Sequence, residues 1–345
     1  TYDEGLINKR DIIEKQYSLQ IYNPQEFIMQ IDQLLHGEEY LPNQLIGIAS
    51  DSVSKLSPQE LSMCVNRFWM QKDGEDKQTI SALVSELINK SEGRLYVLKR
   101  HGDAIAFYGI TEKEDSTDIE LLRIFEKDIC NALFFQIISG VLKRNLKSEK
   151  TRIVFREKYV TEKQKNILDK FGFVLQNDIY IKFVYNIIVA KEEVSSIILQ
   201  SYPSITVDNN DRLLLAVERK LFPLKIKGLN IPTYIVPIMP YWAGQLFDLT
   251  IAGEDLFGAN PEKLWSFENV YYRHTKPITE KYPARILWYV SGKDVRYSHA
   301  KSIVASSYLT DVMTGKPKDL FHVNKRYGIY EWNDIYKLCK FYLKR

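Results

Sequence analysis

The chain has 345 residues, of which 45% are hydrophobic and 26% charged, and its formal net charge is +3. These values are typical of globular proteins, and the length allows two or three domains, each with its own core. No run approaches the roughly 20 apolar residues that cross a bilayer. The charged start TYDEGLINKRDIIEKQYS is unlike a signal peptide, so we expect no membrane association.

The cysteines and histidines show no pattern of metal binding. Cys64, Cys130 and Cys339 lie far apart, and the five histidines have no HxxxH or HExxH spacing. Scattered cysteines are typical of a reducing compartment, and metal sites need clustered ligands. We therefore expect a cytoplasmic protein with no disulfide and no metal.

The net charge is unevenly distributed along the chain. Residues 281–345 contain 13 Lys and Arg against 5 Asp and Glu, a net charge of +8, so residues 1–280 carry −5. A basic end on a mildly acidic body is typical of a protein with a polyanionic partner, although ordinary solvated lysines give the same count.

The first 42 residues contain short helical or extended pieces and no evident core. We interpret them as an arm or as the remnant of a preceding domain. A regular pattern begins at residue 43 with the apolar strand NQLIGIAS. A helix follows, with Ser57 as N-cap, Pro58 at the first helical position and Glu60 completing a capping box. Residues 77–90 then repeat apolar residues at helical spacing.

Residues 94–184 continue with strands and two helices. Strands at 94–100, 104–110 and 118–124 precede a helix at 129–144 and a strand at 151–157. A capped helix begins at Thr161, and a hairpin follows in FGFVLQNDIYIKFV. The predicted order is strand, two helices, three strands, helix, strand, helix and hairpin.

Beyond this pattern, residues 185–211 add a strand, a helix and the polar loop SITVDNNDR, which is the best domain boundary. Residues 212–345 have many prolines and aromatic residues and short apolar strands such as TYIVPIM and ARILWYVSG, which predict a small β-barrel with a few helices. We predict an α+β protein with parts at 1–42, 43–211 and 212–345: an arm, a mixed sheet with flanking helices, and a barrel-like domain.

The order from 43 to 184 resembles the GNAT acyltransferase family. The most specific match is QKNILDKFGFVLQNDIYIKF, which looks like that family's last helix, its Gly-Phe turn and its closing hairpin. The resemblance implies a mixed sheet that is splayed at its centre. It also implies acetyl-CoA in the splay, with its pyrophosphate held by backbone N–H groups of the loop after the fourth strand, at a helix N-terminus.

The loop in that position, EKDICN, departs from the family's pattern of Gln or Arg followed by spaced glycines. Glycine permits close approach of backbone to phosphate, whereas Glu126 and Asp128 bring two negative charges, of which Lys127 offsets one. Carboxylates in a helix's first turn also stabilise the helix itself, so a helix without a ligand explains them equally. If acetyl-CoA binds, the resemblance assigns it to Arg123, Ile124, Lys127, Ile129, Cys130 and Asn131.

The expected catalytic groups also depart from the family's pattern. The family often protonates the leaving thiolate with a tyrosine four residues before the Gly-Phe turn, and Leu168 stands there. Tyr159, Tyr180 or Tyr185 could replace it, and we take Tyr180 as the candidate acid. Glu120, on the fourth strand, is the candidate general base by position, although a strand carboxylate is more often plain surface.

The C-terminal part resembles, over about 213–340, a domain of an uncharacterised prokaryotic group. Dispersed motifs such as ERKLFPLKI, PTYIVPIMPYWAGQLF and LTDVMTGKPKDLFHVNKRYGIYEWNDIYKL carry this resemblance. The group joins a GNAT-like domain to a PUA-like barrel of the ASCH or EVE kind, often after a PIN-type nuclease domain. Residues 8–30 look like the end of such a PIN domain.

PUA-like barrels generally bind RNA or modified bases. Arg and Lys neutralise phosphates, and aromatic faces stack on unpaired bases. The candidate nucleic-acid-binding residues are Arg219, Lys220, Lys225, Arg285, Arg296, His299, Lys301, Lys316, Lys318, Lys325 and Arg326.

These observations leave three hypotheses for function. The leading one is a nucleic-acid-directed protein, acting on RNA, in which a GNAT-like domain, either an unconventional acyltransferase or a degenerate scaffold, is joined to a basic recognition domain. The second is an active acetyl-CoA-dependent N-acetyltransferase. The third is the regulatory module of a toxin–antitoxin or phage-defence system, which would dock a separate protein partner such as a nuclease.

Overall fold

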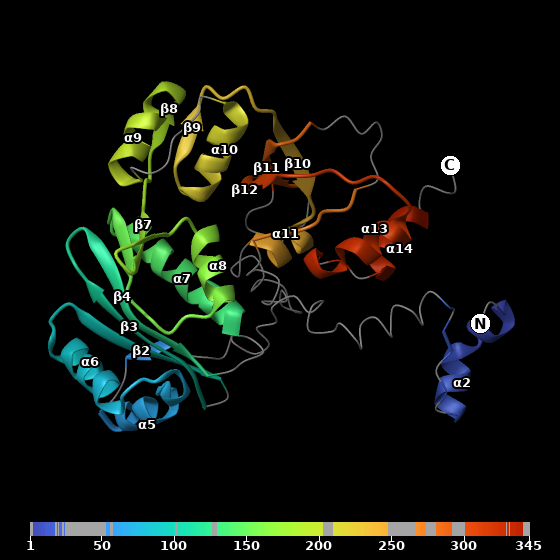
Figure 1. Ribbon diagram of the computed structural model, residues 1–345. Coiled ribbons are helices and arrows are strands. Elements are labelled where there is room, and N and C mark those ends of the chain that lie inside the picture. The colour runs from blue at the N-terminus through green and yellow to red at the C-terminus, as the bar shows by residue number, and fades with distance from the viewer. Residues whose placement is uncertain are drawn as a thin grey trace. The chain divides into compact units, whose positions relative to one another are not determined.

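The computed structural model describes residues 3–17, 19, 21–22, 24, 53–55, 58–100, 103–125, 130–202, 210–247, 267–273, 281–291, 301–328, 330 and 332–340 (Figure 1). It divides into two compact units. The first comprises Thr1–Pro42, Glu268–Ile278 and Met313–Arg345, and the second comprises Asn43–Phe267 and Thr279–Val312. The predicted strand at 43–50 and the N-cap Ser57 lie outside the described residues.

The second unit is built on a seven-stranded mixed sheet. Its strands are β1 (Val53–Lys55), β2 (Gly93–Arg100), β3 (Asp103–Glu112), β4 (Ser116–Ile124), β5 (Arg152–Phe155), β6 (Val174–Gln176) and β7 (Ile179–Phe183). They lie in the order β1-β2-β3-β4-β5-β7-β6. Neighbours are antiparallel except β4 and β5, which run parallel.

Four helices cover the two faces of this sheet: α5 (Pro58–Phe68), α6 (Lys77–Asn89), α7 (Cys130–Lys147) and α8 (Glu162–Lys170). Apolar residues of α5 and α6 share a core with Leu95, Val97, Phe107 and Leu121 of the sheet. Residues of α7 and α8 share another with Ile110, Ile119 and Phe155. From α5 onward the order of elements is the predicted one, so the mixed α+β arrangement of this part is confirmed, whereas the strand β1 at 53–55 was not predicted.

Local sequence signals explain several of these boundaries. The Thr161 side chain accepts from the Gln164 N–H while the Gln164 side chain accepts from the Thr161 N–H, which confirms the capping box of α8. Asn177 and Asp178 join β6 to β7 with φ of 48° and 64°, values that these two residue types tolerate. Gly172 has φ of 84°, and a Cβ there would lie 1.9 Å from the Lys220 carbonyl oxygen, so only glycine fits.

The rest of the second unit contains two small sheets. β8 (Ile188–Ala190) pairs in parallel with β9 (Lys225–Lys227), and α9 (Val194–Ser201), α10 (Asp211–Lys220) and the short 3-10 helix Lys191–Glu193 accompany them. β10 (Thr233–Ile238), β11 (Ala284–Val290) and β12 (Ile303–Leu309) form a three-stranded sheet, with α11 (Pro240–Phe247) after β10. No closed barrel is present among the described residues, so the predicted barrel is not confirmed.

The boundary predicted after residue 211 lies within one apolar core. Val189, Val194 and Ile198 on one side of it pack with Leu214 and Ile226 on the other. The pairing of β8 with β9 crosses the same point. The predicted domain limits stay a prediction, and the described residues on the two sides of the limit at 211 share this core.

The first unit contains α1 (Glu4–Asn8), α2 (Arg10–Tyr17), α13 (Pro317–Asn324), the 3-10 helix Lys325–Tyr327 and α14 (Trp332–Lys340). The Phe321 and Trp332 rings lie 5.6 Å apart between α13 and α14, and Val270 pairs with Gly328 in an isolated bridge. Throughout the described ranges, no helix has both the length and the apolar composition that a membrane crossing requires.

Candidate active site at the divergence of β4 and β5

The parallel strands β4 and β5 part after four pairs. Ile119 faces Phe155 in the last pair, and the Arg156 N–H donates to the Ile119 carbonyl at 2.8 Å. We call β4 residues 120–124 and the facing segment 156–161 the splay. Parallel neighbours that separate leave backbone donors and acceptors without ladder partners, which makes the splay a natural place for a ligand.

A β-bulge coincides with the start of the splay. The register of β3 and β4 shifts because Gly109 faces Leu121 while Ile110 faces Ile119, which leaves Glu120 as the extra residue. The bulge places Ile119 and Leu122 in the same core, on the α7 side of the sheet, and Leu121 in the core on the other side. Bulges change the direction of side chains and occur often beside active sites, so the bulge supports Glu120 as a candidate active-site residue.

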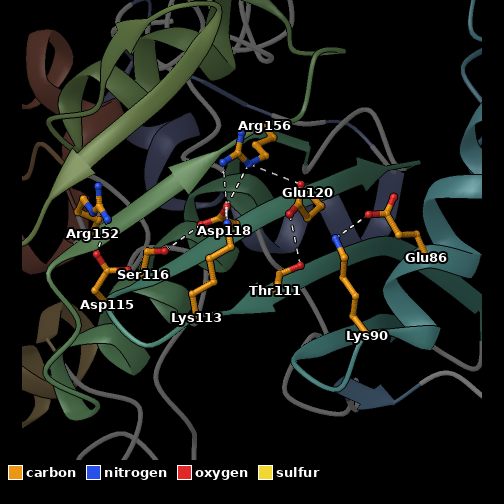
Figure 2. Close-up of polar contacts among 10 residues, drawn as sticks. All are labelled: Glu86, Lys90, Thr111, Lys113, Asp115, Ser116, Asp118, Glu120, Arg152 and Arg156. Atoms are coloured by element: carbon orange, nitrogen blue, oxygen red, sulfur yellow. Dashed lines mark hydrogen bonds and ion pairs between the residues drawn. The ribbon is translucent and has the colours of Figure 1, made fainter.

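Glu120 lies in a polar cluster on the sheet (Figure 2). Its side chain is 15% exposed, the Thr111 hydroxyl donates to one carboxylate oxygen at 3.3 Å, and Arg156 Nε lies 3.7 Å from the other. Asp118 is its fully buried neighbour, with Arg156 at 3.0 Å and Lys113 at 2.6 Å. Glu120 is therefore the more accessible of two carboxylates that share one arginine.

A second charged cluster bridges the splay itself. Arg123 on β4 forms ion pairs with Glu75, at 2.8 Å, and with Glu157, and all three side chains are at most 4% exposed. The Glu157 carboxylate also accepts from the backbone N–H of Leu122 at 3.0 Å and of Tyr159 at 2.8 Å. The Leu122 N–H, which has no partner in the β4–β5 ladder, is thus bonded to the side chain of Glu157 on the facing segment.

Arg123 is not fully satisfied in this cluster. Its Nε is buried and has no hydrogen-bond partner among the described residues, and its guanidinium lies 4.8 Å from the centre of the Tyr159 ring. Burial is the largest influence on its pKa and lowers it, against the opposing charge of Glu75. A buried donor without an acceptor is rare, so this Nε suits a polar atom of a ligand.

The three tyrosines considered as acids lie in different places. Tyr159 lies in the splay, whereas Tyr180 packs against the core on the α7 side, with its ring 6.4 Å from Phe155. Tyr185 packs with the core of β8, α9 and α10, where burial raises its pKa. Leu168 is completely buried. The structure therefore does not bring Tyr180 and Glu120 together: Glu120 bonds to Thr111 on the opposite face of the sheet.

The residues assigned to acetyl-CoA are partly described. Arg123 is buried in the splay, and Ile124 is half-buried against the core on the α7 side. Cys130 and Asn131 begin α7 and are half-buried. The Cys130 sulfur accepts from Gln164 at 3.4 Å, and burial raises the pKa of its thiol. Lys127 and Ile129, with Glu126 and Asp128, lie outside the described residues, so the phosphate-binding role of this loop stays a prediction.

Two of the predicted nucleic-acid-binding residues have internal partners. The fully buried Glu218 accepts from Arg285 Nε at 3.0 Å and from Arg285 Nη2 at 2.5 Å. Lys225 lies 3.3 Å from the same carboxylate and donates to the Tyr308 hydroxyl at 2.7 Å. These two cations hold α10, β9, β11 and β12 together, a role that sequence reasoning did not detect.

The other predicted nucleic-acid-binding residues that the structure describes are divided between the two units. Lys220 pairs with Asp169 at 2.7 Å, and Arg219 and Lys301 are exposed in the second unit. Lys316 and Lys318 are exposed in the first unit, and Lys325 there is half-buried. Arg296, His299 and the side chain of Arg326 lie outside the described residues.

Sequence reasoning did not select Glu75 and Glu157. No local pattern marks them, because their partners lie 48 and 34 residues away in the sequence. In the part of the chain that the structure describes, no group of three or more His, Cys, Asp or Glu is arranged to hold a metal ion.

Comparison with known proteins adds structures but no sequence relatives. No protein-family model matches the chain, and neither does any curated protein. Spermidine N-acetyltransferase from Vibrio cholerae, solved with CoA and spermine, is 13% identical over 39% of this chain and 96% of its own, with a TM-score of 0.31. An acetyltransferase from Thermus thermophilus is 13% identical over 40% of this chain and 100% of its own, with a TM-score of 0.34.

A GNAT family acetyltransferase from Elizabethkingia anophelis, solved with acetyl-CoA bound, is 13% identical over 38% of this chain and 95% of its own, with a TM-score of 0.28. All three TM-scores lie below 0.5. The description of residues 53–184 as a mixed sheet with covering helices rests on the strand order and the parallel β4–β5 pair, and not on these likenesses.

Proposed function

We propose that residues 53–184 form an acyl-CoA-dependent acyltransferase domain that acylates an amine, with Glu120 as the general base. The observation that carries the proposal is the coincidence of three features at one point: the divergence of β4 from β5, the bulge in β4, and a partly exposed carboxylate on the bulge residue. Fold alone does not fix function, so the proposal depends on this site.

Bound acyl-CoA would supply an activated thioester carbonyl. Glu120 would accept the proton of the attacking amine, because the Thr111 hydroxyl and Arg156 hold its carboxylate at the edge of the splay. Arg156 is 39% exposed and lies closer to Asp118, at 3.0 Å, than to Glu120, at 3.7 Å.

The splay has two features that suit the chain of acyl-CoA. The Leu122 N–H of β4 bonds to the Glu157 side chain and not to a strand, and Arg123 Nε is a buried donor without an acceptor among the described residues. Leu122 and Arg123 are therefore the residues that would hold the ligand.

Tyr159 is the better candidate for the acid that protonates the leaving thiolate, because Tyr180 lies on the other face of the sheet from Glu120. Tyr159 lies in the splay beside Arg123, and Tyr180 lies across the last β5–β7 pair from Phe155. Replacing each by Phe separates them: the variant of the acid loses kcat, whereas the other variant keeps it.

Calorimetric titration with acetyl-CoA tests the proposal, followed by an acyl-transfer assay against a panel of amines. Glu120→Gln should leave the Kd for acetyl-CoA unchanged and lower kcat by about 10²- to 10⁴-fold, the usual contribution of a general base. Glu162→Gln is the matched control, because this carboxylate is 87% exposed on α8. Absence of binding by the wild-type protein at millimolar acetyl-CoA would contradict the proposal.

We also propose nucleic-acid binding, directed to RNA, as a second function of the region after residue 211. The observation that favours it is an exposed cation and an exposed aromatic residue three positions apart at the end of α10: Arg219 is exposed, and Phe222 is 45% exposed. A guanidinium and an unburied aromatic face are the groups that contact phosphates and stack on unpaired bases. The surplus of +8 over residues 281–345 supports the same proposal.

Gel-shift titration with single-stranded RNA over a series of salt concentrations tests this second function. Arg219→Ala should weaken binding and reduce the slope of log K against log salt by about one, and Phe222→Ala should weaken binding without changing the slope. Lys165→Ala, an exposed lysine on α8, is the control. Failure to bind at low salt would remove the proposal.

A further inference from the structure

The backbone of β4 has one donor in the splay whose partner is unusual. After the Arg156 N–H to Ile119 bond, the next β4 donor on that side is the Leu122 N–H, and it bonds to the Glu157 side chain at 3.0 Å rather than to a backbone carbonyl. A carboxylate has thus replaced the carbonyl that a continued β5 strand would have supplied.

The Glu157 carboxylate is held in place from several directions. Besides the Leu122 N–H it accepts from the Tyr159 N–H at 2.8 Å and pairs with Arg123, and its side chain is 2% exposed. Glu75 pairs with Arg123 from the other side and accepts from the Met70 N–H at 2.9 Å. Two carboxylates therefore share one guanidinium, so the cluster has one carboxylate more than charge balance requires.

We propose that Glu157 competes with the acyl-CoA chain for the Leu122 N–H, and that binding requires its carboxylate to move aside. The inference rests on the proposed function, because the occupant is the amide-bearing, extended part of acyl-CoA. An amide carbonyl of such a chain would accept from Leu122 as an added strand does, by main-chain hydrogen bonding. Arg123 and Glu75 would remain as a neutral pair after Glu157 moves.

The charge balance allows the bond between Glu157 and the Leu122 N–H to be removed without leaving a buried charge unpaired. Glu157→Ala removes the surplus carboxylate and leaves Arg123 paired with Glu75. Removal of Arg123 would instead leave two buried carboxylates unpaired, so Glu157 is the member to change. Glu162→Ala, five residues along and exposed, is the matched control.

Hydrogen exchange at the Leu122 amide tests the contact, and titration with CoA as the probe tests the competition. In Glu157→Ala we expect exchange at Leu122 to become at least about tenfold faster and CoA to bind about tenfold more tightly, the effect of one lost competing hydrogen bond. Glu162→Ala should match the wild type in both measurements.

The outcomes separate this inference from the proposed function. Unchanged exchange at Leu122, or equal CoA affinity in wild type and Glu157→Ala, would overturn the competition while leaving acyl-CoA binding intact. If neither protein binds CoA, the proposed function fails and the competition fails with it. If Glu157→Ala does not fold, the wild type alone can be used for the test. Addition of CoA should shift the carboxylate carbon resonance of Glu157. An unshifted resonance at saturation would overturn the proposal.

Discussion

Two buried carboxylate clusters in the second unit differ in how completely their members are paired. Glu218 accepts five hydrogen bonds or ion pairs, from Arg285 twice and from Lys225, Tyr308 and the Ile226 N–H, and it ties α10 to three strands. In the cluster at the splay, Arg123 Nε lacks a partner among the described residues. The Glu157 carboxylate accepts from the Leu122 N–H, which would normally donate to a neighbouring strand.

This contrast indicates where to expect function in a chain with few sequence signals. A fully satisfied buried network specifies packing, whereas a partly satisfied one is strained or awaits a ligand. Lys225 and Arg285 were predicted to bind nucleic acid from their charge and sequence position, but both are paired with Glu218. The splay cluster is only partly paired, and it is therefore the better candidate for a functional site.

Arg123→Met should produce the largest loss of stability, because it disrupts the splay cluster. It leaves Glu75 and Glu157 buried without their shared cation, and loss of one partner from a buried pair costs about 3–5 kcal/mol. Urea unfolding followed by circular dichroism measures it. A loss below about 1 kcal/mol would show that water or a nearby cation already compensates these carboxylates.

Glu218→Gln should have the next largest effect, in the fully paired cluster. Loss of the charge-assisted bonds costs about 2–3 kcal/mol, less than above because Arg285 and Lys225 keep 20% and 33% exposure and can be hydrated. Thermal unfolding at several pH values adds a second check. Burial alone would raise the pKa of Glu218, but the bonds from Arg285 and Ile226 and the charge of Lys225 outweigh it, so the pKa is lowered.

The sign of that pH dependence follows from linkage. A lowered folded pKa stabilises the protein above the unfolded value, 4.5, and the contribution is lost as the pH falls through the folded value. The difference in stability between wild type and Glu218→Gln should therefore be complete at pH 6 and shrink below about pH 4.5. A difference that stays constant down to pH 3 would contradict the assignment.

Lys182 is a third buried ionisable site, which differs from the two carboxylate clusters because its partner is a backbone carbonyl. Its side chain is completely buried, its ammonium donates to the Phe171 carbonyl at 2.7 Å, and burial lowers its pKa to about 7. The unfolded chain keeps this proton up to about pH 10.5, so stability should rise between pH 7 and 10.5 by about 1.4 kcal/mol per pH unit at most. Lys182→Met should lack the rise and be the more stable protein at pH 6; parallel pH profiles of the two proteins would refute this.

Thr161→Ala should give the smallest effect and tests the support of the splay segment. The capping box ends the segment that carries Glu157 and Tyr159, and loss of such a cap costs about 1 kcal/mol. Lys165→Ala, which removes only an exposed pair with Glu162, should change stability by less than about 0.5 kcal/mol. Chemical unfolding of both variants checks this, and equal losses would show that the box is not what stabilises α8.

Sequence signals alone account for the parts of the fold that depend on neighbours along the chain. The apolar spacing of 77–90, the capping box at Thr161 and the Asn177-Asp178 turn all act within a few residues, and the structure places α6, α8 and the β6–β7 hairpin as expected. The order of elements from α5 onward follows from these signals, and with it the mixed α+β arrangement. Glu120 could be selected because its place on β4 follows from that order.

Which charged groups meet, by contrast, depends on the packing of whole elements. Glu157 bonds to Leu122, 35 residues earlier, Arg285 pairs with Glu218 across 67 residues, and Tyr159 rather than Tyr180 lies in the splay. Hydrogen bonds and ion pairs depend on distances of a few ångströms that this packing sets, and no periodicity along the chain encodes them. The bulge at Glu120 has the same origin, because a register is a property of two strands and not of one.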